Sequence, residues 1–328
     1  MASEPTTLRL QVAEARELNL LIRMFRLRAA DGAVLPGFEP GAHIRVRVDL
    51  GGGQSDWRQY SLIDFAHGGQ ATPDEYRIAV RKEAAGRGGS RFMHERLREG
   101  DAIEIEPPKN DFPLHGGPGR AVLLAGGIGI TPLASMAARR RAQGLPVELH
   151  YAGRSRALMA FLPELGELLG ADLLLHDDES RGAPFDVGTL LERCGPADQL
   201  YVCGPRPMLD AVLAQTQARG WNGDRVHFEL FTAPVAEEGD HAFEVELAQS
   251  GQRFTVPADQ SILDCLVEHG CDPMFDCKRG ECGVCATPVI EGEIDHRDYV
   301  LTAREKAEGN VMQICISRAK GARLVLDI

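Results

Sequence analysis

The stretch Cys277-Lys-Arg-Gly-Glu-Cys282-Gly-Val-Cys285 holds three cysteines, and Cys315 follows after about 30 more residues. This C-x4-C-x2-C…C spacing is typical of a plant-type [2Fe–2S] cluster, in which four thiolates bind two irons. Glycines inside the loop can adopt positive φ, which lets backbone N–H groups point at the sulfurs. A zinc site, which more often has paired C-x2-C knuckles, and cysteines without a ligand are the alternatives. The residues expected to bind the irons are Cys277, Cys282, Cys285 and Cys315.

Length and composition indicate a globular protein of two or three domains, because 328 residues exceed one ordinary core. No apolar run reaches the roughly 18 residues of a membrane span, so we expect no membrane partner. The net charge of −12 disfavours nucleic acid, whose phosphates require clustered Lys and Arg. The start has an early acid, Glu4, and no apolar core, so eight cysteines predict reduced thiols or metal ligands. We expect a cytoplasmic monomer.

The first hundred residues have the pattern of short strands separated by Gly and Pro turns, which predicts a small antiparallel barrel. One helix, Ser90–Arg98, is expected, with Ser90 as its N-cap. The expected strands are Thr7–Ala13, Leu18–Ala29, His43–Asp49, Gln59–Ile63, Tyr76–Val80 and Asp101–Glu106.

Two segments of this barrel have residue types suited to a phosphate-bearing ring. In Arg58-Gln59-Tyr60-Ser61, an Arg can bind phosphate, a Tyr can stack on a flat ring, and a Ser hydroxyl can reach a ring nitrogen. Gly86-Arg-Gly-Gly89-Ser90 places glycines before a helix, which suits an anion. An ordinary strand and an ordinary capped loop are the alternatives for the two segments.

From Arg120 onward the pattern changes to that of a nucleotide-binding α/β unit. The buried run Ala121–Ala125 precedes Gly126-Gly127-Ile-Gly129-Ile-Thr131-Pro132 and a helix over Leu133–Ala142. We expect Thr131 as N-cap and Pro132 at the first helical position. A strand, a glycine turn and a helix N-terminus form a pyrophosphate site, although Pro132 replaces the third glycine of the usual fingerprint. A tight turn without a ligand is the alternative.

Further strands over Val147–Ala152, Asp172–His176 and Gln199–Cys203 predict a parallel sheet with helices near Ala157–Leu169 and Gly188–Glu192. Ligands bind such sheets at the C-terminal ends of the strands. There, Gly153-Arg154-Ser155-Arg156 could hold the adenosine ribose, and Cys203-Gly204-Pro205-Arg-Pro-Met208 a nicotinamide. The alternative for Cys203 is a plain buried thiol. The Pro- and acid-containing stretch 232–240 is expected to be a linker.

The last ninety residues predict a β-grasp module. The segments Ala242–Ala248 and Arg253–Val256 alternate as a hairpin, and Ser261 caps a helix over Ile262–His269. Strands near Thr287–Ile290, Val311–Ser317 and Arg323–Asp327 follow the cysteine loop.

In this order of a barrel with Arg58-Gln-Tyr-Ser, an α/β unit with Cys203-Gly-Pro and a C-terminal cysteine loop, the chain resembles the phthalate dioxygenase reductase family. This family includes the vanillate O-demethylase reductases. The resemblance implies an FMN-binding barrel of the ferredoxin-reductase type at 1–113, an NAD-binding domain at 114–232, a linker at 233–240 and a ferredoxin domain at 241–328. It also implies that electrons pass from NADH through FMN to the cluster and on to a Rieske-type oxygenase component.

The resemblance assigns roles to single residues. For the flavin, it implies Arg58 at the phosphate, Tyr60 against the ring and Ser61 near N5. Thr131 would lie between the flavin and the nicotinamide, Phe231 would cover the other face of the flavin, and Cys203 would contact the dinucleotide. The complete set of implied cofactor-binding residues is Arg58, Gln59, Tyr60, Ser61, Ala79, Val80, Lys82, Gly89, Ser90, Gly127, Gly129, Thr131, Arg154, Cys203, Gly204, Pro205, Met208 and Phe231. Ser61, Thr131, Cys203 and Phe231 are those expected at the reacting atoms.

Some alternatives stay open at this point. Family members mostly use NADH, but Arg154 and Arg156 could accommodate the 2′-phosphate of NADPH. The acceptor could be another oxygenase, such as a diiron monooxygenase, and the chain could instead be an iron–sulfur redox sensor or a plain flavin reductase. Residues 241–328 have 15 acidic and 9 basic residues, so we expect acids such as Asp272, Asp276 and Glu281 to meet a basic partner. A solvated acidic surface is the alternative.

Overall fold

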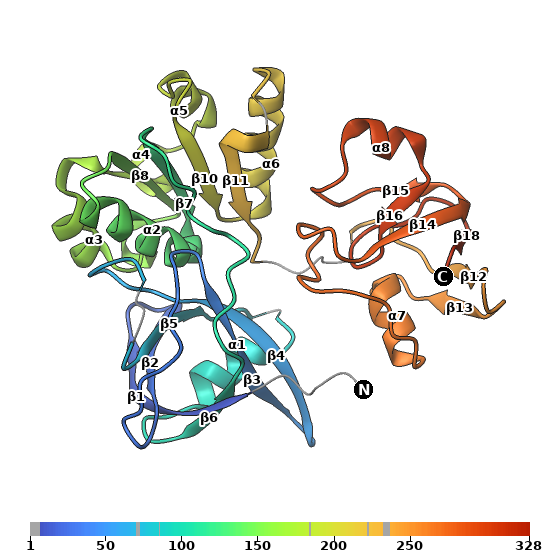
Figure 1. Cartoon of the computed structure of the whole chain (residues 1–328), viewed down its shortest axis with the longest axis horizontal. Coiled ribbons are helices and arrows are strands. Elements are labelled where there is room, and N and C mark those ends of the chain that lie inside the picture. Colours follow the sequence, from blue (N-terminus) through green and yellow to red (C-terminus); the bar gives the residue numbers. More distant parts are fainter. Residues whose placement is uncertain (1–6, 70–72, 85, 184, 222, 232–236) are drawn as a thin grey trace. The chain divides into compact units, whose positions relative to one another are not determined.

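The computed structural model describes residues 7–69, 73–84, 86–183, 185–221, 223–231 and 237–328 (Figure 1). The chain divides into two compact units, Met1–Phe231 and Thr232–Ile328. The expected linker 233–240 lies partly outside the described residues. No helix in the described ranges is long and apolar enough to cross a bilayer.

The first sheet is antiparallel and curls into an open barrel, as the turn-rich sequence predicts (Figure 1). Its strand order is β4-β3-β6-β1-β2-β5, so β4 and β5 form the two edges. Its core is made of alternating inward side chains, such as Phe25, Ile44 and Ile78, all 0% exposed. The strands are β1 Leu8–Glu17, β2 Ile22–Arg28, β3 His43–Gly51, β4 Gln54–Ser61, β5 Tyr76–Arg81 and β6 Ala102–Ile105.

The helix expected at Ser90–Arg98 differs in its start and its form. A single turn, α1 (Gly89–Arg91), runs into a π-helical segment, Phe92–Arg96. The prediction of Ser90 as N-cap is wrong, because Gly88, with φ of 84°, occupies that position. A left-handed φ is accessible to glycine at low cost, so the helix begins two residues early. The Ser90 hydroxyl instead accepts a hydrogen bond from the N–H of Glu83 at 3.0 Å.

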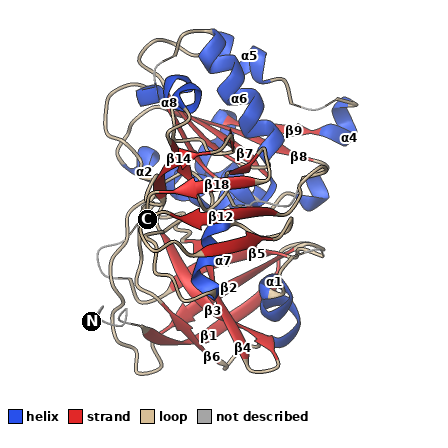
Figure 2. Cartoon of the chain, turned by 90° about the vertical axis from the view of Figure 1, so that its right-hand side faces the viewer, coloured by secondary structure: helices blue, strands red, loops and turns tan. Residues whose placement is uncertain are grey.

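The second sheet of this unit is parallel, with the strand order β11-β10-β7-β8-β9 and helices on both faces (Figure 2). This arrangement confirms the α/β prediction, and every residue of β7 is buried, as a strand covered on both faces requires. The strands are β7 Ala121–Gly126, β8 Val147–Gly153, β9 Leu173–Asp177, β10 Gln199–Cys203 and β11 Val226–Glu229. The helices are α2 Ile130–Ala142, α3 Leu162–Leu169, α4 Asp178–Arg181, α5 Val187–Glu192 and α6 Arg206–Ala218.

Helix α2 begins earlier than the sequence predicts. Residues Gly127–Gly129 form a 3-10 turn that continues into α2, so Gly129 is the N-cap. The prediction of Thr131 as N-cap and Pro132 as first helical residue is therefore wrong. Thr131 lies in the first turn, where its hydroxyl donates to the carbonyl of Ile128 at 3.1 Å. Pro132 is tolerated there because N–H groups of the first turn have no partner within the helix.

The second unit is a mixed sheet folded around a helix, which confirms the β-grasp prediction. The sheet order is β13-β12-β18-β14-β16, with β12 and β18 parallel. Helix α7 buries Ile262, Leu263 and Leu266 in the core of this unit, and Ser261 caps it as expected. Its strands are β12 Phe243–Leu247, β13 Arg253–Val256, β14 Ala286–Glu291, β15 Ile294–Asp295, β16 Val311–Gln313, β17 Arg318–Ala319 and β18 Arg323–Leu326. Its helices are α7 Ile262–Glu268 and α8 Ala303–Glu308.

Cys315 does not lie in a strand, contrary to the sequence prediction. Strand β16 ends at Gln313, and the following residues turn. This turn brings Cys315 back toward the cysteine loop. An extended strand that continued to Ser317 would place Cys315 beyond that loop.

Candidate flavin, dinucleotide and iron–sulfur sites

Arg58 on β4 and the glycine loop before α1 come together at one end of the barrel. The guanidinium of Arg58 donates to the carboxylate of Asp56 and, at 3.2 Å, to the carbonyl of Arg87. Gly89 is buried against this side chain, because a Cβ at that position would lie 2.7 Å from Nε of Arg58. A cation beside a glycine turn and a helix start has the chemistry of a phosphate cradle.

Ser61 ends the same strand and is almost fully buried. Its hydroxyl has no hydrogen-bond partner among the described residues. A buried hydroxyl without a partner is costly, so a bound group with a polar ring atom would satisfy it. Together with the cradle at Arg58, this hydroxyl shows that the residues present fit a phosphorylated flat ring such as a flavin.

The other residues expected at the flavin ring differ in burial and in their hydrogen bonds. Tyr60 is half-buried on β4, and burial raises its pKa, so the phenol stays neutral. Ala79 and Val80 are buried on the edge strand β5. The backbone N–H of Lys82 already donates to the carbonyl of Leu21 at 2.7 Å. Gln59 is half-buried on β4 beside them.

Helix α2 is bonded directly to the segment that follows Ser61. The hydroxyl of Ser135 donates to the carbonyl of Leu62 at 2.9 Å and accepts from the N–H of Asp64 at 3.0 Å. Thr131 precedes Ser135 by about one helical turn and is 2% exposed. These bonds fix the start of α2 relative to the end of β4, and so relate Thr131 to Ser61.

The glycine turn after β7 packs directly on the turn after β10. A Cβ at Gly129 would lie 2.1 Å from the carbonyl oxygen of Cys203, and one at Gly126 would lie 2.5 Å from Cδ of Pro205. A Cβ at Gly204 would lie 2.1 Å from Cε of Met208. The structure thus brings together the two motifs that the sequence predicts for the dinucleotide, at the C-terminal ends of parallel strands.

Three further residues near the ends of these parallel strands differ in exposure. Arg154 lies just after β8, the strand next to β7, and is exposed. Phe231 is half-buried and packs on the apolar core of the first unit. Glu229, which the sequence reasoning did not select, is 4% exposed and lies opposite Cys203 in the β10–β11 register. An acidic residue within the otherwise apolar-rich stretch 226–231 was the signal that could have identified it.

The four cysteines expected to bind the irons lie together, three of them on one loop. Cys277, Cys285 and Cys315 are 6%, 4% and 3% exposed, while Cys282 is half-buried. The thiols of Cys282 and Cys315 contact Cys277, and Cys285 also contacts Cys315. No three His, Cys, Asp or Glu side chains in the described ranges surround one point suitable for a single metal ion. A [2Fe–2S] cluster with Cys₄ ligation has two irons, so its sulfurs need not converge on one point.

The loop backbone is shaped to stabilise negative sulfur. Lys278, Gly280 and Gly283 have φ of 54°, 75° and 78°, which confirms the expected positive φ at both glycines. The N–H of Arg279 points at Sγ of Cys277 at 3.3 Å. The contact with Cys315 and the N–H groups of Arg279 and Glu281 lower the pKa of Cys277.

The side chain of Gln313 also indicates whether the residues around the cysteines fit an iron–sulfur cluster. Its Oε1 lies 3.3 Å from Sγ of Cys285, and its buried Nε2 has no hydrogen-bond partner among the described residues. The two amide orientations are interchangeable in assignment. With a thiolate at Cys285, the reversed amide would donate its N–H to sulfur and leave no donor unsatisfied. The residues present therefore fit a thiolate-bound cluster.

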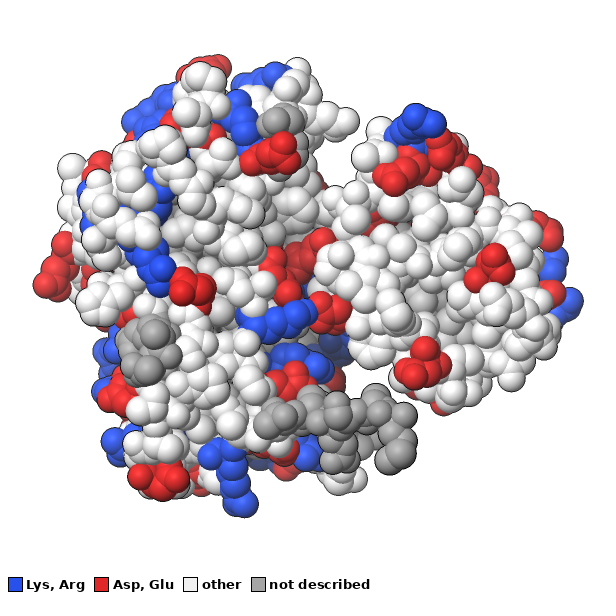
Figure 3. Space-filling model, viewed as in Figure 1, with Lys and Arg blue, Asp and Glu red and all other residues white. Residues whose placement is uncertain are grey.

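Some of the acidic residues in and near the cysteine loop form ion pairs within the unit, which the sequence does not indicate. Glu281 is bound at 2.7 Å by the guanidinium of Arg279, and both side chains are about one-tenth exposed or less. Glu281 is therefore no free acid for a partner, whereas Asp272 is exposed. Asp240, at the end of the expected linker, is bound by Arg297 at 3.1 Å within the second unit. The visible face of this unit shows more acidic than basic surface (Figure 3).

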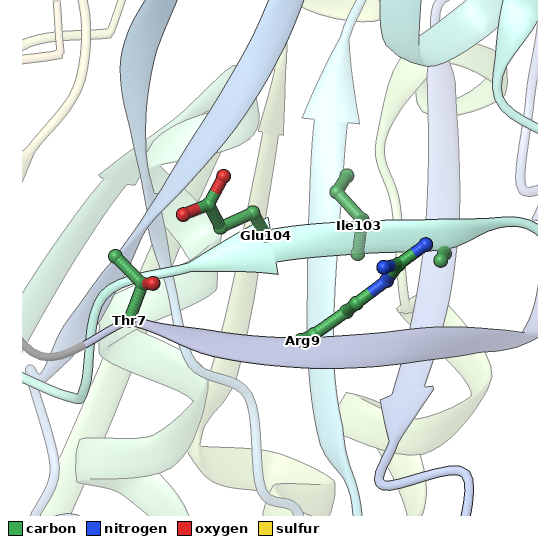
Figure 4. A pocket seen from close by; sticks show the side chains of 5 residues that line it. Thr7, Arg9, Ile103 and Glu104 are labelled. Carbon is green, nitrogen blue, oxygen red and sulfur yellow. The ribbon is translucent and has the colours of Figure 1, made fainter.

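A shallow hollow on the barrel lies apart from these residues. It is lined by Thr7, Arg9, Ala102, Ile103 and Glu104, which come from β1, β6 and the residue before β1 (Figure 4). None of the residues predicted from the sequence to bind a cofactor lines it.

Comparisons with known proteins agree with this architecture. The 2Fe-2S iron-sulfur cluster binding domain family matches residues 245–320. Vanillate O-demethylase oxidoreductase of Acinetobacter baylyi is 37% identical over 318 residues, covering 97% of this chain and 98% of its own. The heme-dependent oxidative N-demethylase beta subunit of Ectopseudomonas mendocina is 38% identical over 323 residues, covering 98% and 99%. The structure of phthalate dioxygenase reductase matches with a TM-score of 0.75 and 38% identity over 98% of both chains.

The fold, the cysteine loop and these matches define a modular oxidoreductase, with a flavin- and pyridine-nucleotide-binding fold and its own [2Fe–2S] domain. Such enzymes transfer electrons from a pyridine nucleotide to the iron–sulfur centre. Within that class, the chain belongs to the phthalate dioxygenase reductase family.

Proposed function

We propose that this protein is the reductase component of an oxygenase system. It takes electrons from NADH through FMN to its [2Fe–2S] cluster and delivers them to a separate oxygenase protein. The observation that supports this best is that one chain carries a phosphate cradle with an unsatisfied serine, a glycine turn on parallel strands and a cysteine loop. The flavin supplies the exchange between a two-electron donor and a one-electron acceptor, and the cluster supplies the one-electron carrier.

For the flavin, we assign the phosphate to Arg58, Gly89 and the helix start at Ser90. The closed contact between Arg58 and Gly89 supports a ligand that ends in a single phosphate there, as FMN does. The hydroxyl of Ser61 donates to the ring, and the neutral phenol of Tyr60 packs on it. Ala79 and Val80 line the opposite edge of the barrel opening.

For the dinucleotide, Gly127 and Gly129 bind the pyrophosphate, and Arg154 lies toward the adenosine. The turn Cys203-Gly204-Pro205 with Met208 holds the nicotinamide end. Cys203 is 0% exposed, so it serves by shape, as a packed side chain beneath the turn. Thr131 would lie between the flavin and the nicotinamide, and Phe231, packed on the apolar core of the first unit, would cover the other flavin face and exclude water.

The reconstituted protein gives the direct test. We expect iron and acid-labile sulfide in equal amounts, FMN as the only flavin released on denaturation, and prompt bleaching of the visible spectrum by NADH without air. Release of FAD would contradict the assignment at Arg58. A spectrum that NADH does not change would favour the redox-sensor alternative.

We further propose a Rieske-type oxygenase as the acceptor, supported by membership of the phthalate dioxygenase reductase family. One relative is named as part of a heme-dependent N-demethylase, so a haem oxygenase is the second candidate. Isolation of the electron-accepting partner and a visible spectrum of its iron centre separate the two. A Soret band in that partner would overturn the Rieske assignment.

A further inference from the structure

The side chain of Gln313 lies beside one of the cysteines expected to bind iron, at the point where strand β16 ends. Its amide group is 3.3 Å from Sγ of Cys285. The backbone of Gln313 is paired with Ala286, the residue after Cys285, in the β14–β16 register. The N–H of Ile314 also donates to the carbonyl of Cys285 at 3.4 Å. These backbone contacts fix the start of the Gln313 side chain close to this cysteine.

The amide of Gln313 is buried, and burial limits what it can bond to. The residue is 1% exposed, and its Nε2 has no hydrogen-bond partner among the described residues. A buried donor without a partner is costly. A thiol at Cys285 can donate to Oε1, but an iron-bound thiolate has no proton to donate. Because the two ends of an amide are interchangeable in assignment, the thiolate requires Nε2 to face the sulfur. Cluster binding thus gives the orphaned donor its partner.

This donor differs in kind from the other donors around the cysteine sulfurs. The N–H of Arg279 donates to Sγ of Cys277 at 3.3 Å, and the N–H of Cys315 donates to the sulfur of Cys285. Both belong to the backbone, so they follow from the path of the loop and no substitution removes them cleanly. The amide of Gln313 belongs to a side chain. Its contribution therefore comes from this residue alone and can be removed by mutation.

A buried N–H beside a cluster sulfur acts unequally on the two redox states. One-electron reduction adds one unit of negative charge, which the cysteine sulfurs share. An N–H dipole directed at a sulfur stabilises the more negative state more strongly, and the exclusion of water from a 1% exposed side chain strengthens this effect. Hydrogen bonds to the sulfurs are among the factors that set the potentials of iron–sulfur centres. The expected effect of the amide is therefore a higher reduction potential.

Resting on the cluster of the function proposed above, we propose that Gln313 raises the reduction potential of the iron–sulfur centre by donating its side-chain N–H to Sγ of Cys285. A higher potential at the cluster favours electron transfer from the flavin and leaves less driving force for transfer to the acceptor protein. Gln313 thus sets how the total driving force is divided between the step into the cluster and the step out of it.

A redox titration of the holoprotein, followed by the EPR signal of the reduced cluster, tests this inference. Gln313→Met keeps a long, buried side chain but has no N–H. We expect the equilibrium constant for electron uptake by the cluster to fall about three- to tenfold, which corresponds to a potential about 30–60 mV more negative. Gln252→Met, on the exposed turn between β12 and β13, is the matched control and should leave the potential unchanged.

A second measurement detects the amide nitrogen directly. Wild-type protein is prepared with glutamine labelled with ¹⁵N at Nε2, and the reduced cluster is studied by pulsed EPR. We expect a weak coupling between the ¹⁵N nucleus and the electron spin of the cluster, and we expect it to be absent from Gln313→Met. A side chain that only fills space would produce no such coupling. This measurement needs only the wild type, so it decides the question even if Gln313→Met does not assemble its cluster.

The outcomes separate this inference from the function on which it rests. If the cluster assembles and Gln313→Met has the potential of the wild type or a higher one, the inference is overturned and the proposed function stands. Absence of the ¹⁵N coupling in the labelled wild type also overturns it. If the reconstituted wild type contains no iron and acid-labile sulfide, the proposed function itself fails.

Discussion

The hydroxyl of Ser135 donates to the carbonyl of Leu62 at 2.9 Å and joins helix α2 to the end of strand β4. The same hydroxyl accepts the N–H of Asp64, and it is 0% exposed. The Ser135 side chain thus satisfies the Leu62 carbonyl and the Asp64 N–H, which lie in the segment directly after β4. The relation between Thr131 and Ser61 depends on this bridge.

Replacing Ser135 should weaken the first unit. Ser135→Ala leaves a buried carbonyl at Leu62 and a buried N–H at Asp64 without partners, at a cost of about 1–3 kcal/mol. We expect a lower melting temperature for the flavin-containing transition in calorimetry and a slower reduction of the flavin by NADH. Ser250→Ala, at an exposed position, should change neither. Equal stability of Ser135→Ala and wild type would contradict the role of the bridge.

Gly89→Ala should weaken flavin binding. The new Cβ would lie 2.7 Å from Nε of Arg58, so the guanidinium must move from the cradle. Displacing a charge-assisted contact to phosphate costs about 1.5–3 kcal/mol, which corresponds to at least about a tenfold weaker flavin affinity. Fluorescence of released flavin measures this directly. Gly116→Ala, where a Cβ would meet nothing within 4 Å, is the matched control and should retain its flavin.

Cys282→Ser should disconnect the two halves of the electron path. Loss of one thiolate ligand removes or alters the cluster, so reduction of cytochrome c, a one-electron protein acceptor, should fall to near background. Ferricyanide, which takes electrons at the flavin, should still be reduced at the wild-type rate. Cys271→Ser is the control, because Cys271 lies near the loop but outside the ligand set. Equal loss of both activities at unchanged flavin content would refute the assignment.

Acid should destabilise the second unit through Asp240. A hydrogen bond from Arg297 lowers the pKa of Asp240 to about 2, from an ordinary value of 3.8. A carboxyl with a lowered pKa in the folded state contributes stability that is present above pH 3.8 and lost as the pH falls toward 2. The side chain is 7% exposed, and we expect about 1–2 kcal/mol from it at neutral pH.

The comparison of Asp240→Asn with wild type measures this contribution. Thermal unfolding of the holoprotein at pH 7 should show a lower transition for the cluster-containing unit in the variant, with the difference shrinking as the pH approaches 3. Asp327→Asn, at an exposed position, should show no such loss. A difference that is independent of pH would rule out the ion pair as its source.

Local sequence chemistry was enough to predict much of this architecture. Cysteine spacing identified the cluster loop, and the buried run at Ala121–Ala125 identified the central parallel strand. Alternation identified the hairpin of β12 and β13. These signals are local because each arises from residues that are neighbours along one strand or loop.

The features that were missed depend on tertiary neighbours. Positive φ at Gly88 and Gly127 moved two helix starts, since it offered a turn that cap preference alone does not show. Cys315 lies in a turn whose position depends on contacts with Cys277 and Cys285, which are far from it in the sequence. Glu229 becomes notable only opposite Cys203 in the β10–β11 register. No spacing within one segment encodes these pairings.

The parallel pairing of β12 with β18 has a consequence for the order in which this protein matures. Strand β18 lies at the centre of its sheet, between β12 and β14, yet it comes later in the sequence than the four cysteines expected to bind the irons. A ribosome therefore releases every strand of the first unit, which ends with β11, before the second sheet can close. Domains emerge and fold from the N-terminal side, so the flavin unit can fold while the cysteine loop still lacks its central support. Iron and sulfide must reach a chain whose reductase half is already in place.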